Sequence, residues 1–169
     1  MIAVVSVVSL VSACAPRPAA TEPTGIPLGE TRPPRDLALA VTVLGSAADD
    51  PLAPQPARFV IEPDGLLRAA TGSGVGPGVY PPRTRRLIDA QIAEIYTMLV
   101  RSGLDRGVGG MAYRPGLLPG EGRWILVEVT AHERREIALY DPARSEAARD
   151  IALHLARLAR LDAPDNAAR

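Results

Sequence analysis

The feature that most limits the fold is a proline-rich stretch close to the amino terminus. Six prolines fall within residues 15–35, with small and polar residues between them and no periodic apolar pattern: Pro16, Pro18, Pro23, Pro27, Pro33 and Pro34. Proline fixes the backbone φ angle and has no amide hydrogen to donate, so such a stretch does not join a helix or a central strand. We therefore expect residues 14–35 to form an extended, solvated tether, with the folded domain beginning near residue 36.

The chain begins with a short apolar segment. Residues 1–13 read MIAVVSVVSLVSA and contain no charged side chain. At about 1.5 Å per residue a helix of this length covers roughly 20 Å, which is less than the hydrocarbon thickness of about 30 Å. The segment is too short to span a membrane comfortably. Its length, with small residues at its end, is typical of a secretory signal peptide.

The apolar segment ends in Val11-Ser12-Ala13-Cys14, which contains the one cysteine of the chain. This tetrapeptide resembles the lipobox of bacterial lipoproteins, in which an aliphatic residue and two small residues precede a cysteine. The resemblance implies that the signal peptide is cut between Ala13 and Cys14, and that Cys14 then carries acyl chains on its sulfur and its new amino group. Several acyl chains anchor a protein stably, whereas one chain binds a membrane only marginally. The alternative is that residues 1–13 form a buried apolar element ending in an ordinary cysteine.

Charge and cysteine content narrow the class of partner. Nineteen arginines balance nineteen acidic residues, lysine is absent, and apolar residues make up 47% of the 169 residues. A neutral chain has no overall basic field of the kind that attracts proteins to nucleic acid, so we expect no nucleic-acid partner. The apolar fraction is close to the globular average and suits one core of ordinary size. A single cysteine forms neither an intramolecular disulfide nor a cysteine-rich metal site.

The first part of the domain contains strand patterns. Apolar residues alternate with small residues through residues 37–43, which is the period of a strand with one apolar face. A loop over residues 45–56 follows. Residues 62–65 read EPDG, with proline at the second position and glycine at the fourth, which is typical of a type I turn. The pattern therefore predicts a hairpin between residues 57–61 and residues 66–70.

A helix is expected in the middle of the domain. Apolar residues recur at three- and four-residue steps through residues 87–102, and Gly103 supplies a left-handed stop. The next segment, residues 104–122, contains six glycines and two prolines. A loop of that length in a compact domain is either partly structured or functional. Its apolar side chains either cover the core or form part of a binding surface.

The last part of the domain predicts a second hairpin and a second helix. Residues 124–131 and 136–140 have strand character, with residues 132–135 at the hairpin tip. An apolar stripe through residues 145–161 predicts the helix, with Asp141 or Ser145 as its N-cap.

Together these patterns predict one α+β domain over residues 36–161, followed by a fraying tail over residues 162–169. The elements follow the order strand, hairpin, helix, hairpin, helix. We expect an antiparallel sheet of about five strands with both helices on one face.

Residues able to carry out catalysis are few. His132 lies at the predicted hairpin tip and His154 on the last predicted helix, and each is interpreted as a structural or solvated residue. Ser73 lies in a glycine-rich segment, residues 71–78, whose spacing matches neither a dinucleotide fingerprint nor a P-loop. No nucleophile-elbow pattern surrounds this serine. We therefore predict no catalytic residue.

A metal or cofactor site is not expected either. No pair of histidine, cysteine or carboxylate side chains has ligand spacing on one predicted element. Glu128 and Glu136 are expected near one another across the second hairpin, where carboxylates are usually solvated. We predict no metal ligand and no cofactor.

Arginines cluster at two places. Arg83, Arg85 and Arg86 precede the first predicted helix, and Arg134 and Arg135 lie at the tip of the second predicted hairpin. Guanidinium groups form paired hydrogen bonds with phosphates and carboxylates, so these arginines are candidate contacts for anionic lipid, polysaccharide or an envelope protein. The alternative is that they supply charge for solubility in a chain without lysine.

The lipobox resemblance and the domain pattern lead to one expectation. They imply a protein anchored through acylated Cys14 to a membrane of the bacterial cell envelope, with its domain outside the cytoplasm and a non-catalytic binding or interaction role. One alternative is an envelope hydrolase or an enzyme accessory domain, whose site is built from the two long loops and includes Ser73, Tyr80 or Tyr113. Another is a protease inhibitor that presents a loop.

Overall fold

The structure is a computed structural model that describes residues 32–45, 56–72, 74–116 and 122–160. Its strands are β1 (Ala38–Leu44), β2 (Ala57–Ile61), β3 (Leu66–Thr71), β4 (Arg83–Arg86), β5 (Met111–Ala112), β6 (Trp124–Ala131) and β7 (Arg134–Tyr140). Its helices are α1 (Asp89–Ser102), the short 3-10 helix η1 (Leu104–Arg106) and α2 (Glu146–Leu158).

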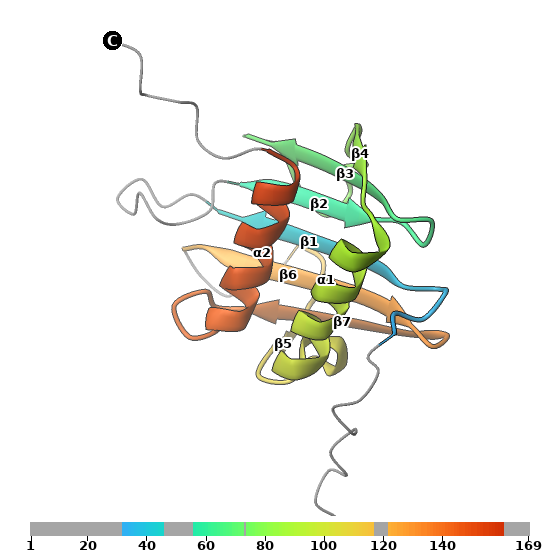
Figure 1. The fold of residues 1–169 in the computed structure, drawn as a ribbon. Coiled ribbons are helices and arrows are strands. Elements are labelled where there is room, and N and C mark those ends of the chain that lie inside the picture. The colour runs from blue at the N-terminus through green and yellow to red at the C-terminus, as the bar shows by residue number, and fades with distance from the viewer. Residues whose placement is uncertain (1–31, 46–55, 73, 117–121, 161–169) are drawn as a thin grey trace, which may run out of the picture. The chain divides into compact units, whose positions relative to one another are not determined.

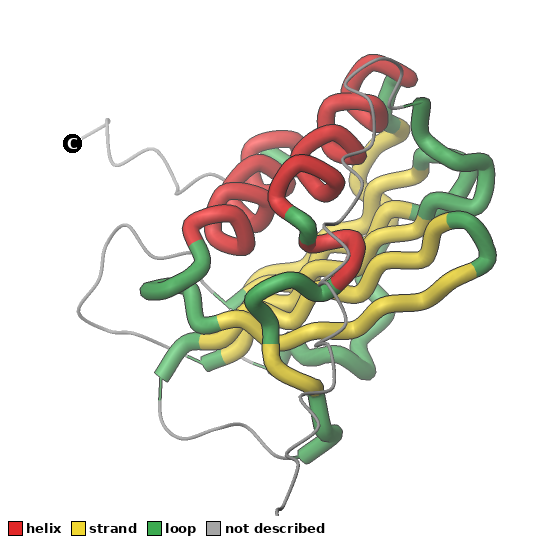
Figure 2. The backbone as a smooth tube through the Cα atoms, turned by 90° about the horizontal axis from the view of Figure 1, so that it is seen from below, coloured by secondary structure: helices red, strands yellow, loops and turns green. Residues whose placement is uncertain are grey.

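Within the described residues, seven strands form one sheet in the order β4-β3-β2-β1-β6-β7-β5 (Figure 1). Every neighbouring pair in this sheet is antiparallel. Both α-helices lie on the same side of the sheet, so the fold has two layers (Figure 2). The predicted fold class, an antiparallel sheet with two helices, is confirmed.

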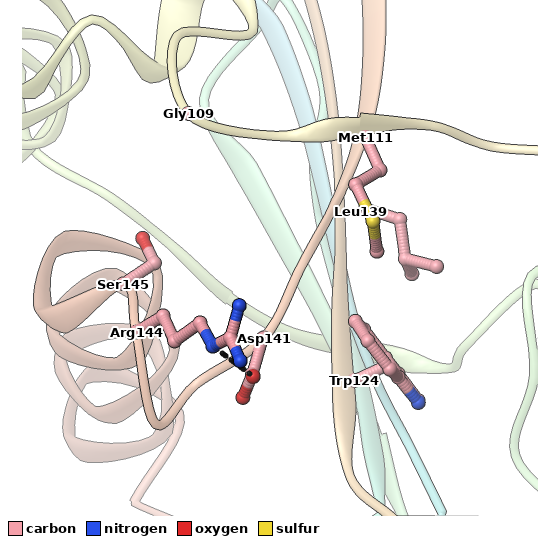
Figure 3. Close-up of a pocket in the computed structure, with 7 residues that line it drawn as sticks. All are labelled: Gly109, Met111, Trp124, Leu139, Asp141, Arg144 and Ser145. Atoms are coloured by element: carbon pink, nitrogen blue, oxygen red, sulfur yellow. Dashed lines mark ion pairs between the residues drawn. The ribbon is translucent and has the colours of Figure 1, made fainter. Parts of the chain in front are cut away.

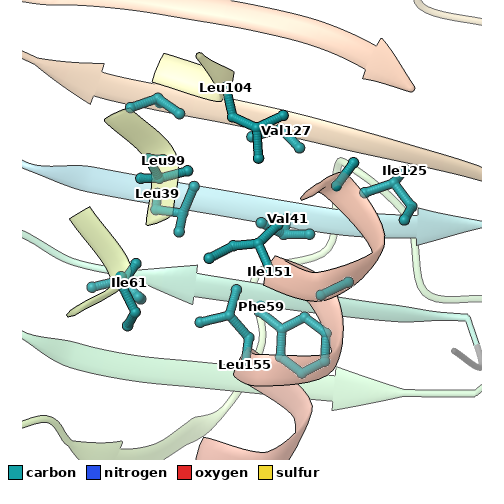
Figure 4. Close-up of a cluster of buried hydrophobic side chains, with 14 of the residues drawn as sticks. Leu39, Val41, Phe59, Ile61, Leu99, Leu104, Ile125, Val127, Ile151 and Leu155 are labelled. Carbon is teal, nitrogen blue, oxygen red and sulfur yellow. The ribbon is translucent and has the colours of Figure 1, made fainter. Parts of the chain in front are cut away.

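The central strand β1 joins the two predicted hairpins. Its Val41 lies opposite Phe59 on β2 and opposite Val127 on β6, so one apolar row crosses three strands. Paired residues in a sheet share a face, and the helices cover this one. The result is the main core (Figure 4), which contains Leu39, Val41, Phe59, Ile61, Ile125, Val127, Ile95, Leu99, Ile151 and Leu155.

The ends of the two helices follow local capping rules. α1 stops at Gly103, whose φ of 74° is the left-handed conformation that glycine adopts without strain. α2 begins after Ser145, whose hydroxyl accepts a hydrogen bond from the Ala148 amide at 3.3 Å. Asp141, the other candidate cap, instead accepts from the Ala143 amide at 2.9 Å and shapes the turn before the helix.

The sheet has two strands more than the five that the sequence predicts. Both additional strands, β4 and β5, are edge strands. β4 reads RTRR and has no apolar alternation, and β5 is only two residues long, so neither gives a strand signal in the sequence. β5 and η1 lie in the long glycine-containing loop, which is therefore partly structured.

The tip of the second hairpin is shorter than predicted. His132 and Glu133 both have positive φ angles, 53° and 61°, as in a two-residue type I′ turn. β7 therefore begins at Arg134, and Arg134 and Arg135 lie in the strand rather than at the tip. The prediction failed because two-residue turns of this type are usually marked by Asn-Gly, Asp-Gly or Gly-Gly, and His-Glu is not one of these signals.

The predicted signal peptide, Cys14 and most of the predicted tether lie outside the described residues, as does the predicted tail. Within the part of the chain that the structure describes, no helix is long and apolar enough to cross a membrane.

Candidate functional site

The face of the sheet opposite the helices, called here the helix-free face, carries a chain of polar contacts. Arg58 on β2 is only 9% exposed, and its Nη1 donates to Thr42 Oγ1 at 2.5 Å and to Glu128 Oε1 at 3.3 Å. The other carboxylate oxygen of Glu128 accepts from Arg135 Nη2 at 3.0 Å. These contacts connect β2, β1, β6 and β7. A buried charge is costly unless it is paired, and here each charge has a partner.

A second polar cluster lies on the outer strands of the helix-free face. Arg68 Nε donates to Glu62 Oε1 at 2.8 Å, and the guanidinium lies 4.4 Å from the centre of the Tyr80 ring. The Tyr80 hydroxyl donates to the same Glu62 oxygen. The hydrogen bonds from Tyr80 and Arg68 lower the pKa of Glu62. Tyr80, a candidate for a loop-built site, thus holds the end of the glycine-rich segment to β3.

The remainder of the helix-free face is apolar. Leu126 pairs with Thr42 on one side and with Leu139 on the other, so all three side chains point to this face. The two leucines belong to what we call the second apolar cluster, in which Tyr113, Trp124 and Ile137 pack against the buried Leu44, Leu126 and Leu139. Tyr113, another candidate of the loop-built site, is therefore part of a packed surface.

A pocket of about 270 Å³ opens at the edge of the second apolar cluster, where β7 leads into α2 (Figure 3). One side of it is apolar and comes from the strands, whereas the other side is polar and comes from the turn before α2 (Figure 3). Its lining residues are Gly109, Met111, Trp124, Leu139, Asp141, Arg144 and Ser145.

The polar side of the pocket carries one ion pair. Arg144 Nε lies 3.4 Å from Asp141 Oδ2, and the two side chains are 88% and 33% exposed. The backbone beneath the pair is fixed, because Asp141 accepts from the Ala143 amide and Ser145 caps α2. On the apolar side, the indole nitrogen of Trp124 points away from the ion pair (Figure 3). The pocket therefore combines an apolar wall with an exposed pair of opposite charges.

A buried tyrosine on the helix-covered face is the second candidate. Tyr140 is 1% exposed, and its hydroxyl has no hydrogen-bond partner among the described residues. Burial, with the charges of Glu136 and Asp105, raises the pKa of Tyr140 to about 12. Burial also raises the pKa of Asp105. Tyr140, Glu136 and Asp105 do not line the pocket. We interpret them as structural residues at the edge of the main core.

The first arginine cluster is mostly engaged within the molecule. Arg85 Nη1 donates to the Leu158 carbonyl at 3.3 Å, at the end of α2. Arg86 Nη2 donates to Asp64 Oδ2 at 2.9 Å. Arg83 is exposed and has no hydrogen-bond or ion-pair partner among the described residues. A single exposed guanidinium does not form an anion-binding site.

The second arginine cluster is split in the same way. Arg135 pairs with Glu128, whereas Arg134 is exposed and has no such partner in the described part of the chain. β4 and β7 are separated by five strand spacings, or about 24 Å at roughly 4.8 Å per spacing. The structure therefore does not bring the two predicted arginine clusters together.

Both histidines have structural contacts. His132 Nε2 lies 3.2 Å from the Tyr96 hydroxyl, and the His132 amide donates to Asp36 Oδ1 at 3.0 Å. His154 Nε2 lies 3.9 Å from Glu94 Oε2 and so connects α2 to α1. Neither histidine lines the pocket.

The expected proximity of Glu128 and Glu136 is wrong. Glu128 pairs with Ile137 and Glu136 with Val129, so the two carboxylates point to opposite faces of the sheet. No group of three His, Cys, Asp or Glu side chains suited to a metal ion occurs among the described residues. Ser73 lies outside the described residues.

No protein-family model matches the chain, and no curated protein is similar to it in sequence. The site therefore has to be interpreted from its own geometry. Sequence reasoning missed the pocket residues Trp124, Asp141 and Arg144. One signal was available in the sequence. Trp124 begins the first strand of the second hairpin and Asp141 follows its second strand, so both lie at the open end of that hairpin.

Proposed function

We propose that this chain is a lipid-anchored protein of the bacterial cell envelope whose domain binds a small ligand in the pocket between β7 and α2, without catalysing a reaction. The anchoring part rests on the resemblance of Val11-Ser12-Ala13-Cys14 to a lipobox. The observation that carries the binding part is the pocket itself, in which an apolar wall faces an exposed ion pair. Sites for small molecules have this composition, mostly apolar with a few polar groups that fix orientation.

The pocket is a better candidate than the polar contacts elsewhere on the helix-free face. Arg58, Glu128 and Arg68 are already paired with protein groups, so a ligand would have to displace those partners. At the pocket, in contrast, Met111 is 44% exposed and the Arg144 side chain is 88% exposed. These groups are available to a ligand without rearrangement of the fold.

The chemistry of the described lining residues supports a non-catalytic role. Ser145 has the hydroxyl that could act as a nucleophile, but this hydroxyl already accepts the Ala148 amide as the helix cap. Nucleophilic catalysis by serine needs an adjacent base. Among the described lining residues the one carboxylate, Asp141, is paired with Arg144, which favours its role as a fixed negative charge.

The anchor is tested by intact-mass analysis of protein recovered from bacterial membranes, with Cys14→Ser as the comparison. We expect a mature chain that begins at Cys14 and carries acyl chains, and we expect both features to be lost in the variant. An unmodified chain in the soluble fraction would overturn the anchoring proposal.

Binding is tested with the mature protein in detergent, using the fluorescence of Trp124, the one tryptophan of the chain. A panel of amino acids, sugars, short peptides and nucleotides is titrated. We expect at least one class to shift the emission saturably, and we expect Met111→Ser to weaken that response. Ile88→Ser is the matched control, because Ile88 is 64% exposed and does not line the pocket. No saturable response from any class, or equal loss in both variants, would contradict a binding pocket.

A further inference from the structure

We infer that the ligand of this pocket is an amino acid with a large apolar side chain, bound with its ammonium and carboxylate groups both charged. This inference rests on the proposed function, because it names the ligand class of the same pocket. It depends on three features: the two charges of the polar side, the composition of the apolar side, and the size of the space between them.

The two charges of the polar side are available to a ligand. The Arg144 and Asp141 side chains meet only at Nε and Oδ2, 3.4 Å apart. The two Nη atoms of Arg144 have no hydrogen-bond partner among the described residues, so they can donate a pair of hydrogen bonds to a carboxylate. Exposed ion pairs contribute little to stability, so ligand charges can take over either partner at small cost.

The need to satisfy both charges favours a ligand that carries both signs. A ligand carboxylate bound to the Nη atoms of Arg144 brings a second negative charge close to Asp141, and an ammonium group on the same ligand offsets this repulsion. An amino acid places an ammonium and a carboxylate on one carbon. The ammonium can pair with Asp141 while the carboxylate pairs with Arg144, which matches two protein charges that already lie side by side.

The opposite wall suits an apolar side chain. Met111, Trp124 and Leu139 line it, and the indole nitrogen of Trp124 points away from the ion pair (Figure 3). Met111 is an adaptable side chain that fits apolar groups of different shape. The wall continues into the second apolar cluster, so it is supported by packed side chains beneath.

The size of the pocket limits the ligand to a single residue. Its volume of about 270 Å³ lies just below the range of about 300–1,000 Å³ that is usual for ligand pockets. Gly109 lines the pocket without a side chain that would reduce this space. A space of this size holds one amino acid with a bulky side chain, whereas a longer peptide would extend into solvent.

The test uses the mature protein and L-phenylalanine as the probe, with Trp124 fluorescence and calorimetry as readouts. Three related compounds each remove one feature: N-acetyl-L-phenylalanine lacks the ammonium, L-phenylalanine amide lacks the carboxylate, and glycine lacks the apolar body. We expect saturable binding of L-phenylalanine and affinities at least about tenfold weaker for the other three, because each leaves a protein group without its partner.

Variants separate this inference from a general effect of charge. Asp141→Asn keeps an oxygen that can accept the Ala143 amide but removes the negative charge, and Arg144→Gln removes the positive charge. Arg149→Gln is the control, because Arg149 lies on α2, pairs with Glu146 and does not line the pocket. We expect the first two to weaken binding of L-phenylalanine about tenfold and the control to leave it unchanged.

The outcomes distinguish this inference from the proposed function. If another compound class binds in the pocket while L-phenylalanine does not, or if the blocked forms bind equally well, the amino acid is the wrong ligand and the binding role stands. If no compound class gives a saturable response, both are wrong. Equal loss in Arg149→Gln and Arg144→Gln would show that the measured effect is not made by the pocket.

Discussion

The two faces of the sheet are built from the same seven strands but are stabilised by different interactions. The helix-covered face is apolar along β1, β2 and β6, and its side chains interlock with those of α1 and α2. The helix-free face alternates between paired charges, as at Arg58 and Glu128, and the second apolar cluster. Dispersion and burial hold the first face together, whereas the second also contains charged groups with little exposure, which need partners of opposite charge.

This difference separates stability from recognition. On the helix-covered face, the large apolar side chains of the described residues are buried against one another. The helix-free face ends in a pocket where Met111 and Arg144 are exposed and Asp141 is half-buried. We therefore expect substitutions on the first face to change the free energy of unfolding most, and substitutions around the pocket to change binding with little effect on the fold.

The largest effect is expected for Phe59→Ala on the helix-covered face. Phe59 is fully buried between β1, β3 and α2, so its removal loses burial and leaves a cavity. We expect the free energy of unfolding to fall by about 3–5 kcal/mol, measured from the urea midpoint. Val79→Ala, in an exposed loop position, is the control. A loss below about 1 kcal/mol at Phe59 would mean that this face repacks, and the contrast between faces would disappear.

A smaller effect is expected for Arg58→Leu on the helix-free face. The variant leaves Thr42 and one oxygen of Glu128 without their donor, although Glu128 keeps Arg135. We expect a loss of about 2 kcal/mol in the free energy of unfolding. Arg86→Leu, which breaks an exposed pair with Asp64, should cost less than about 1 kcal/mol.

The double variant Arg58→Leu with Glu128→Met tests the reason for that loss. Removing both partners also removes the partly buried Glu128 carboxylate that has lost one of its two donors, so the double variant should be more stable than Arg58→Leu alone. If the two losses simply add, the polar network stabilises the sheet by itself and the distinction between the faces must be redrawn.

The same contrast explains how much of the molecule could be predicted from the sequence. The helix-covered face follows from periodicity: the alternation around Val41 and the helical stripe through residues 87–102 both lead to the observed elements. Each of these positions is buried for one reason, its apolar side chain. β4 escaped prediction because an edge strand such as Arg83–Arg86 is held by backbone pairing, which leaves no pattern in the side chains.

The candidate site was less predictable because it depends on register. The two-residue turn at His132 and Glu133 sets the register of the second hairpin and pairs Glu128 with Ile137 and Glu136 with Val129. The predicted four-residue tip would also have placed Glu128 and Glu136 on opposite faces, because a turn with an even number of residues pairs even with odd positions. The pocket depends on where the end of β7 meets β5. Contacts between strands that are far apart in the sequence are fixed by tertiary structure. In the sequence, Asp141 and Arg144 therefore indicate only a turn.

A further contrast concerns a polar group on the apolar face. Tyr140→Phe removes a buried hydroxyl that has no partner among the described residues. We expect the variant to be as stable as the parent chain or up to about 1 kcal/mol more stable at neutral pH. A loss of more than about 1 kcal/mol would indicate that the hydroxyl makes a stabilising contact through water, and that this face also needs a matched polar partner.

Alkaline pH provides a second measurement on the same residue. The folded chain holds the pKa of Tyr140 at about 12, above the usual 10.0, so the folded state favours the neutral hydroxyl. This contribution to stability is complete below pH 10 and is lost as the pH rises towards about 12. Tyr140→Phe should therefore lose less stability across this interval than the parent chain.

The smallest effect on the free energy of unfolding is expected for Asp36, at one end of the sheet. The Asp36 carboxylate accepts from the amides of His132 and Glu133 at 3.0 and 2.6 Å, and so joins the start of β1 to the tip of the β6–β7 hairpin. The hydrogen bond from the Glu133 amide is the main reason that the pKa of Asp36 lies below its usual 3.8. A lowered pKa stabilises the fold above pH 3.8 and ceases to do so as the pH falls through the lower folded value.

The variant Asp36→Ala should accordingly unfold with a shallower dependence on acid than the parent chain, with urea midpoints compared at neutral pH and below pH 3.8. The contact is exposed to solvent, so its contribution is screened and should be the least of those considered. Asp64→Ala is an informative companion, because the pKa of Asp64 is also lowered, mainly by the Leu66 amide, at a turn remote from that hairpin tip. If only Asp36→Ala altered the hydrogen exchange of the hairpin amides, the contact of Asp36 with the hairpin tip would stabilise the sheet locally. If both variants altered the exchange of these amides equally, the Asp36 contact would not act locally. Acid would then destabilise the whole sheet, and its effect could not be assigned to one end of it.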